Sequence, residues 1–271
     1  MRNIIWLLVA VMIISAAYPG ESNAESFIKV RGLGWDSFIS GKIRADKGLI
    51  TGSSIDLKDN LGIVDSSVVP ELEGKVGFLG TSRFIISYSP ASYEGRKTIS
   101  KNLVFSGKTF LASEDLKTQL DFDLVSVIYE FAPLPEGVAQ PLTSAEPEMG
   151  LLLGVKYFHT QAQITSNSTG SVQHETFGLP IPVVGLRIQG RLAENIQLES
   201  AGTWMRLKTS ATDVDLYWSD LYGELKLNIV PKIPFGLGYK LTRLSVESDI
   251  NHGFFSGFGF KGWYLMAAIE L

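Results

Sequence analysis

The sequence predicts an all-β fold, an antiparallel transmembrane β-barrel preceded by a signal peptide that is removed. Three observations support this prediction. The N-terminus has the form of a secretory signal, later segments alternate between apolar and polar side chains, and the chain ends on such a segment. Membrane barrels are built from alternating strands of about ten residues. We therefore expect residues 1–24 to be the signal peptide and residues 25–271 to form an outer-membrane β-barrel.

The predicted signal peptide combines a basic start, an apolar run and a small-residue cleavage site. Arg2 precedes the apolar residues 4–17, and a polar stretch then ends in Ser22-Asn23-Ala24. The apolar run is shorter than the roughly 20 residues that a membrane-spanning helix needs. This favours cleavage after Ala24 over an uncleaved anchor. The chain has no cysteine, which excludes a lipid-modified N-terminal cysteine.

The composition fits a β-barrel and argues against a nucleic-acid partner. Glycine occurs 27 times, and 11% of the residues are aromatic, as expected of a β protein with many turns. Later apolar runs are interrupted within a few residues, so a membrane-spanning chain must use strands rather than helices. The net charge of -4 gives no basic excess for nucleic acid, and we expect no nucleic-acid partner.

The alternation is clearest in residues 215–229. Leu221 and Leu225 occupy odd positions, whereas Asp220, Glu224 and Lys226 occupy even positions. Successive side chains of a strand point to opposite faces, so one face of this strand is apolar and the other polar. A soluble sandwich alternates in the same way, with a solvated polar face, but the signal peptide and the aromatic strand ends favour the membrane barrel.

The charges on the polar faces are candidates for the barrel lumen. In residues 119–131, Asp121 and Asp123 share one face, and Leu120 and Phe122 share the other. Together with similar positions on other strands, the candidate lumen charges are Arg83, Asp121, Asp123, Lys156, Arg187, Glu199, Asp220, Glu224, Lys226, Lys240 and Glu270. Acidic and basic groups are nearly balanced, which favours a lumen filled by paired side chains over a selective channel.

The strand count depends on the N-terminal half. If residues 83–110 form one long bent strand and residues 49–57 belong to an outer loop, the barrel has about ten strands. If each segment crosses separately, it has about twelve, and the range compatible with the sequence is eight to twelve. We prefer ten. Residues 59–62 indicate a turn within an outer loop, and they lack the ligand spacing of a calcium loop.

Link lengths predict the orientation, since these barrels have short periplasmic turns and longer outer loops. The tight links 193–195 and 230–232 are expected on the periplasmic side, and the polar links near 166–176, 210–214 and 248–254 outside. The Pro-rich link 132–147 is an exception, because this scheme makes it a long periplasmic connection. Nothing in the sequence explains its length.

The closing segment and several Gly-containing runs carry a resemblance. In residues 257–271, Trp263, Leu265 and Ile269 fall on one face up to the end at Leu271. This resembles the C-terminal strand through which outer-membrane barrels meet the barrel-assembly machinery, although an aromatic last residue is usual there. The runs 150–157, 178–185 and 236–239 resemble uncharacterised proteobacterial outer-membrane β-barrel proteins. The resemblance implies a location in the bacterial outer membrane and a barrel of modest size, and no activity.

The three histidines, His159, His174 and His252, are the natural candidates for chemistry. His159 is expected near the outer end of its strand on the lipid side, where lipid A deacylases keep a catalytic histidine. Those enzymes place a serine two residues later, and this chain has Gln161 there, so the nucleophile is missing. His174 lies beside Glu175 in a polar segment with no partner fixed by spacing. We predict no catalytic residue, no cofactor and no metal site.

Three functions stay open. The first is a non-enzymatic structural or surface-interaction barrel with a side-chain-filled lumen, whose partners are outer-membrane lipids and lipopolysaccharide. The second is a narrow channel or a transporter of small solutes or lipids. The third is a lipid-modifying outer-membrane enzyme.

Overall fold

The structure is a computed structural model that describes residues 27–48, 50–63, 66–78, 82–132, 148–209, 214–248 and 254–271. The predicted signal peptide and residues 133–147 of the Pro-rich link lie outside the described residues. No helix in the described part of the chain has the length and hydropathy needed to cross a membrane.

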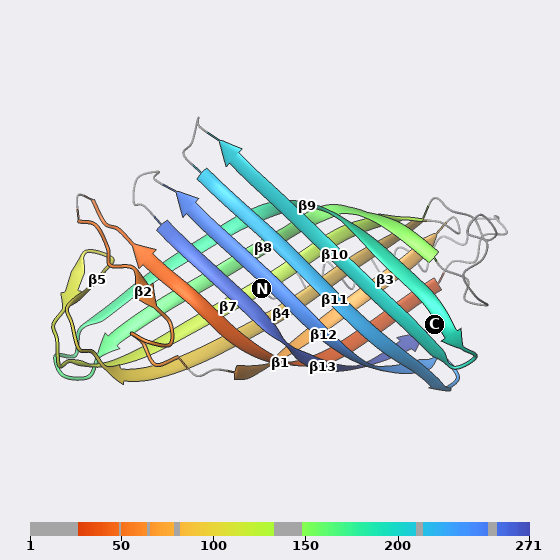
Figure 1. The fold of residues 1–271 in the computed structure, drawn as a ribbon, viewed down its shortest axis with the longest axis horizontal. Helices are drawn as coiled ribbons and strands as arrows, with labels where there is room; N and C mark the ends of the chain where they lie inside the picture. Colours follow the sequence, from red (N-terminus) through yellow and green to blue (C-terminus); the bar gives the residue numbers. More distant parts are fainter. Residues whose placement is uncertain are drawn as a thin grey trace.

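Ten long strands form a closed antiparallel barrel (Figure 1). Each pairs with its neighbour in chain order, and β1 pairs with both β3 and the last strand, which closes the ring. The strands are β1 (Phe27–Ala45), β3 (Ser66–Phe78), β4 (Ser82–Thr98), β7 (Asp115–Phe131), β8 (Glu148–Ser166), β9 (Val172–Ala193), β10 (Ile196–Thr209), β11 (Val214–Val230), β12 (Ile233–Ser248) and β13 (Phe254–Glu270). The predicted count of ten is confirmed.

Three short strands lie in the links. Strand β2 (Ile55–Asp56) pairs with β1, and β5 (Leu103–Phe105) pairs with β6 (Lys108–Phe110) as a separate hairpin. Ser106 and Gly107 form its turn with φ values of 48° and 73°, as a two-residue turn with left-handed residues requires. The expectation of one bent strand over residues 83–110 is therefore wrong, because the barrel strand ends at Thr98 and the chain then folds into a loop.

Long and short links lie at opposite ends of the barrel. The links 46–65, 99–114 and 167–171 share one end, here called the loop end, and the two-residue links 194–195 and 231–232 share the other, the turn end. The chain end at Leu271 lies at the turn end, where its amide donates to the Ile28 carbonyl. The short links 194–195 and 231–232 lie opposite the link 167–171, as predicted. That the turn end faces the periplasm stays a prediction.

The outer surface is apolar toward the turn end and polar toward the loop end. On β8, Leu151, Leu153 and Val155 point outward and are exposed, whereas Gln161 and Gln163 continue the same face near the loop end. The apolar belt is defined by such outward residues on all sides of the barrel, among them Leu151, Leu153, Val155, Leu186, Leu225, Leu237 and Leu265. On β8 the apolar belt extends over residues 149–157. Given the rise per residue and the tilt of the strands, its height along the barrel axis is about 20 Å.

The interior has the opposite order. Charged side chains such as Lys156 and Glu130 are buried at the level of the belt, and large apolar side chains fill the loop half. We call the first the charged layer and the second the apolar core. The apolar core includes Trp35, Tyr93, Phe122, Phe158, Trp218 and Phe260 from the strands, and fully buried Ile55, Leu57, Leu61, Leu103, Phe105 and Phe110 from the links. The links 46–65 and 99–114 thus close the mouth.

Candidate functional site: the barrel lumen

The structure places most of the predicted lumen charges inside the barrel. Buried or partly buried in the lumen are Arg83, Lys156, Arg187, Glu199, Asp220, Glu224, Lys226 and Lys240. Glu270 lies at the rim of the turn end, where its half-exposed carboxylate pairs with Lys29 at 2.5 Å.

Asp121 and Asp123 differ from the prediction, because they lie on the outer surface. The buried residues of β7 are the even-numbered ones, including Leu120 and Phe122. Asp123 accepts a hydrogen bond from the Tyr88 hydroxyl at 2.6 Å. The polarity of this stretch is reversed because it lies beyond the apolar belt, where solvent surrounds the barrel and the interior is apolar.

Arg187 is the centre of the charged layer. Its guanidinium lies 2.5 Å from Glu130, 2.8 Å from Glu148 and 3.4 Å from Glu199. Arg83 also pairs with Glu130, at 3.0 Å, and with Glu148. One guanidinium therefore joins carboxylates from three strands, and Arg187 itself comes from a fourth.

The network continues from Glu199 across the lumen. Lys226 lies 2.5 Å from Glu199 and 3.6 Å from Glu224, and Arg31 lies 3.2 Å from Glu224 and 3.0 Å from Glu73. Arg31 belongs to β1 and Glu224 to β11, and two strands of the ring separate them. The ion pairs therefore connect strands that are not neighbours in the ring, through the lumen.

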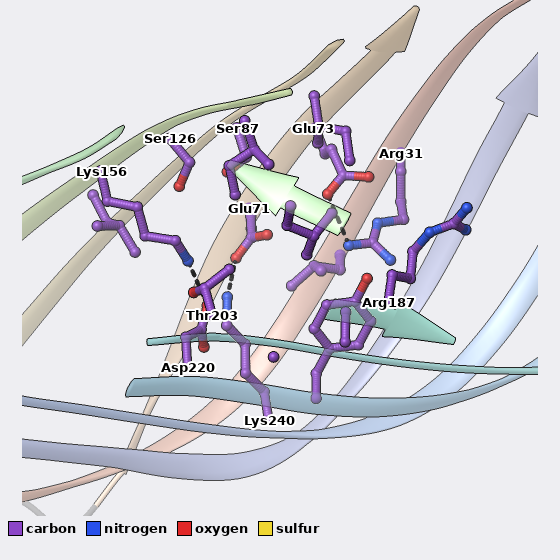
Figure 2. A pocket seen from close by; sticks show the side chains of 18 of the residues that line it. Arg31, Glu71, Glu73, Ser87, Ser126, Lys156, Arg187, Thr203, Asp220 and Lys240 are labelled. Carbon is purple, nitrogen blue, oxygen red and sulfur yellow. Dashed lines mark hydrogen bonds and ion pairs between the residues drawn. The ribbon is translucent and has the colours of Figure 1, made fainter. Parts of the chain in front are cut away.

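A second set of ion pairs adjoins the apolar core (Figure 2). Lys156 lies 2.6 Å from Asp220, and Lys240 lies 2.8 Å from Glu71. The Lys156 ammonium lies 5.1 Å from the centre of the Trp218 ring, and that of Lys240 lies 5.2 Å from the Trp35 ring. These cation–π contacts join the charged layer to the apolar core.

The charges of the layer balance, and sequence reasoning missed several of them. Within the described residues, seven cations face seven carboxylates: Arg31, Lys75, Arg83, Lys156, Arg187, Lys226 and Lys240 against Glu71, Glu73, Glu130, Glu148, Glu199, Asp220 and Glu224. Arg31, Glu71, Glu73, Lys75, Glu130 and Glu148 were not among the candidates. In β3, charges at 71, 73 and 75 that alternate with uncharged Leu72, Gly74 and Val76 were a detectable signal.

Small residues make room for the charged layer. A Cβ atom on Gly150 would lie 2.5 Å from the Glu130 carboxylate, and one on Gly238 would lie 2.3 Å from the Tyr264 ring. Space remains for a cavity of about 60 Å³ lined by Arg31, Lys156 and other members of the layer, enough for a few water molecules. The glycine runs that carry the resemblance thus have a packing role here.

The two histidines within the described residues, His159 and His174, lie apart on the outer face of the barrel. His159 faces outward at the edge of the apolar belt, directly across from Asp123, with its ring stacked on Tyr157 at 6.4 Å between centroids. His174 lies across from Gln163 on the outer face. The neighbouring Glu175 accepts a hydrogen bond from Ser106. His252 lies outside the described residues, and among those described no three metal-binding side chains gather.

Comparison with known proteins identifies the fold. The sequence matches no protein-family model and no curated protein. The outer membrane protease OmpT from Escherichia coli has a similar structure, with a TM-score of 0.54 and 10% identity over 93% of this chain and 98% of that one. The translocator domain of the autotransporter NalP from Neisseria meningitidis matches with a TM-score of 0.45 and 10% identity, over 96% and 95% of the two chains. Ail of Yersinia pestis matches with a TM-score of 0.38 and 11% identity, over 90% and 99%.

At such identities the likeness to OmpT shows the fold and no activity. The closed ring, the apolar belt and the filled lumen agree with that fold. The chain has the fold of the outer-membrane β-barrels of Gram-negative bacteria, and this supports a location in the bacterial outer membrane.

Proposed function

We propose that this protein is a closed, non-conducting barrel without enzymatic activity, which acts as a structural or surface-interaction protein and meets lipopolysaccharide with its outer face. One observation carries the proposal. The lumen is filled twice in series, first by the charged layer and then by the apolar core.

The charged layer opposes ion flow because its charges already have partners. Arg31 pairs with Glu224, and Lys240 pairs with Glu71, in both cases across the lumen and among buried groups. A passing ion would have to separate such pairs, and breaking a buried pair costs several kcal/mol. A layer with seven charges of each sign also has no net field that would attract one kind of ion.

The apolar core opposes flow in a different way. Phe122 packs against Tyr93, Phe158, Phe258 and Phe260 with ring centroids 5.0 to 6.0 Å apart. Side chains of the links 46–65 and 99–114 cover this cluster. An ion entering the cluster would lose its hydration without gaining a polar ligand, which is the basis of hydrophobic gates.

Planar-bilayer recordings of the refolded chain, residues 25–271, test the closed lumen. We expect no discrete conductance from the wild type. Two variants should also stay silent, one with alanine at Arg187, Glu199 and Lys226 and one with alanine at Tyr93, Phe122 and Phe260, because each keeps one seal. Reproducible steps from the folded wild type would contradict the proposal and favour the transporter.

The non-enzymatic part of the proposal needs its own measurement. His159 has no serine two residues later, where Gln161 stands, and this supports the absence of a hydrolase. Mass spectra of lipid A from cells that overexpress the protein should match those of cells that carry an empty vector. Loss of an acyl chain on overexpression would instead favour the lipid-modifying enzyme.

A further inference from the structure

The outer surface carries basic side chains on one side of the barrel, where β10, β11, β12 and β13 lie side by side (Figure 1). Arg206 on β10, Arg243 on β12 and Lys261 on β13 point outward and are exposed. Among the described residues none of the three has an ion-pair or hydrogen-bond partner. Lys208 is left out of the group because Asp215 lies directly across from it.

These three cations lie just beyond the aromatic edge of the apolar belt. Trp204 precedes Arg206 by two residues, and Trp263 follows Lys261 by two, so each pair shares the outer face and the cation is nearer the loop end. Tyr239 lies four residues before Arg243 on the same face. Aromatic girdles mark the membrane interface of such barrels. The cations are therefore at the depth of the lipid headgroups in the outer leaflet.

The register places the three cations in a row around the barrel, with Arg243 between the other two. Arg206 lies across from Tyr217, and Arg243 from Ser219 on the same strand β11, which puts their Cα atoms about 12 Å apart. Arg243 and Lys261 are staggered by two residues on adjacent strands, about 8 Å apart. From β10 to β13 register partners lie progressively nearer the loop end (Figure 1). From Arg206 to Arg243 and from Arg243 to Lys261, each cation is shifted by two residues toward the turn end relative to the register partner of the one before. This shift offsets the tilt of the strands, so the three cations lie at similar heights along the barrel axis.

Small residues lie between the cations on the outer face. Ser219 lies between Trp204 and Arg243, and Gly259 lies between Arg243 and Ser40 in the ladder. The Ser40 hydroxyl donates to the Gly259 carbonyl at 3.4 Å, and the Ser219 hydroxyl lies on the outer face between the cations. Asp36 on β1 also faces outward, and within the described residues it forms no ion pair with Lys261.

The opposite side of the barrel is different. Arg96 pairs with Asp115 at 2.5 Å, and Lys117 lies 3.8 Å from Glu94. These two cations therefore have carboxylate partners, and the outer face of β7 also carries Asp121 and Asp123. Within the described residues, Arg206, Arg243 and Lys261 on the β10–β13 side differ from these two cations in having no such ion pair.

We propose that Arg206, Arg243 and Lys261 form a binding site for the phosphate groups of a lipid A molecule in the outer leaflet. The inference names the lipopolysaccharide contact of the proposed function, and it depends on the membrane placement rather than on the closed lumen. Lipid A is an anionic glycolipid with phosphates on its disaccharide headgroup, and Lys and Arg near a membrane surface each contribute on the order of 1 kcal/mol to binding an anionic surface. Trp204 and Trp263 would contact its sugar and upper acyl chains.

Binding of defined lipids to the folded chain, residues 25–271 in detergent, tests the proposal by native mass spectrometry. The probes are bisphosphorylated lipid A and the same lipid without phosphates. We expect the wild type to prefer the bisphosphorylated form, and the variant Arg206→Gln/Arg243→Gln/Lys261→Gln to lose affinity for it by on the order of 100-fold. The matched control Arg96→Gln/Lys108→Gln/Lys117→Gln should change less than about threefold.

A charge-preserving variant separates binding from folding. Arg206→Lys/Arg243→Lys/Lys261→Arg should retain affinity within roughly tenfold, because it keeps the charges and loses only bidentate geometry. Equal binding of both lipid A forms by the wild type, or an equal loss in the Gln and control variants, would overturn the proposal. Competition by millimolar inorganic phosphate alone would reassign the site to free phosphate. Bilayer conductance is a separate readout, so an open lumen would leave this result unaffected.

Discussion

Replacing Arg187 by methionine should lower the free energy of unfolding by about 3 kcal/mol. Methionine preserves much of the side-chain volume, so the change isolates the charge. The Arg187 side chain is 3% exposed, and its partners Glu130 and Glu199 are 0% and 1% exposed. Removing one partner of a buried ion pair costs roughly 3 to 5 kcal/mol. Each carboxylate keeps one other cation, and the adjoining cavity can admit water, so the low end applies.

The buried charge left behind, rather than the lost contact, is the expected cause. Among the ion pairs of the described residues, Glu130 then keeps the one to Arg83, at 3.0 Å. A second substitution, Glu130→Gln, should therefore recover a large part of the loss. In a double-mutant cycle the two changes should show a coupling of roughly 1 to 3 kcal/mol.

Denaturant titration of the refolded barrel in lipid vesicles, followed by tryptophan fluorescence, measures these values. Lys29→Met is the matched control, because its partner Glu270 is 49% exposed, and exposed pairs contribute less than about 1 kcal/mol. The reasoning is refuted if Arg187→Met costs no more than this control. Simple additivity of Arg187→Met and Glu130→Gln would equally refute it.

Three further predictions follow from particular contacts. Phe122→Ala should lower the free energy of unfolding by about 3 to 5 kcal/mol in the same titration, because it removes the ring at the centre of the apolar core. Gly150→Ala should cost about 1 to 3 kcal/mol, because its Cβ would lie 2.5 Å from a buried carboxylate oxygen. In the link before β7, the hydrogen bond from Ser166 holds the pKa of Glu114 below its ordinary value of 4.5. The folded pKa is the lower one, so this stabilisation is complete above about pH 4.5 and is lost as the pH falls through the folded pKa. Hydrogen exchange of residues 99–114 should therefore speed up in acid, beyond the intrinsic change, in the wild type and not in Glu114→Gln.

For the C-terminal half of the barrel, the inward and outward faces of the strands could be predicted from the sequence, because the lipid around the belt requires apolar side chains on the outer face. In β11, Leu221 and Leu225 face outward, and Asp220, Glu224 and Lys226 face the lumen. This stretch lies at the apolar belt, where an outward charge is costly. A period of two then assigns every residue of the strand to its face without further information.

The assignment failed for Asp121 and Asp123 because alternation alone does not say which face is inside. Both lie toward the loop end of β7, beyond the apolar belt, and their neighbours across the strands are Ser92 and His159. There the solvent lies outside and the core inside, as in a soluble barrel. Which face is polar depends on whether a residue lies within the apolar belt or beyond it. The sequence of a single strand does not show where the belt ends.

The reversal of polarity along single strands has a physical reason. A strand that is apolar on both faces at membrane depth would give a long apolar run, which reads as a membrane helix and aggregates in water. Charges on the inward face interrupt that run, and folding pairs them across the lumen, as Arg187 and Glu130 show. Beyond the membrane the outer face is solvated, so the interior can be an apolar core such as the Phe122 cluster. The two fillings of the lumen are thus consequences of the two media around the barrel, lipid at the belt and water toward the loop end.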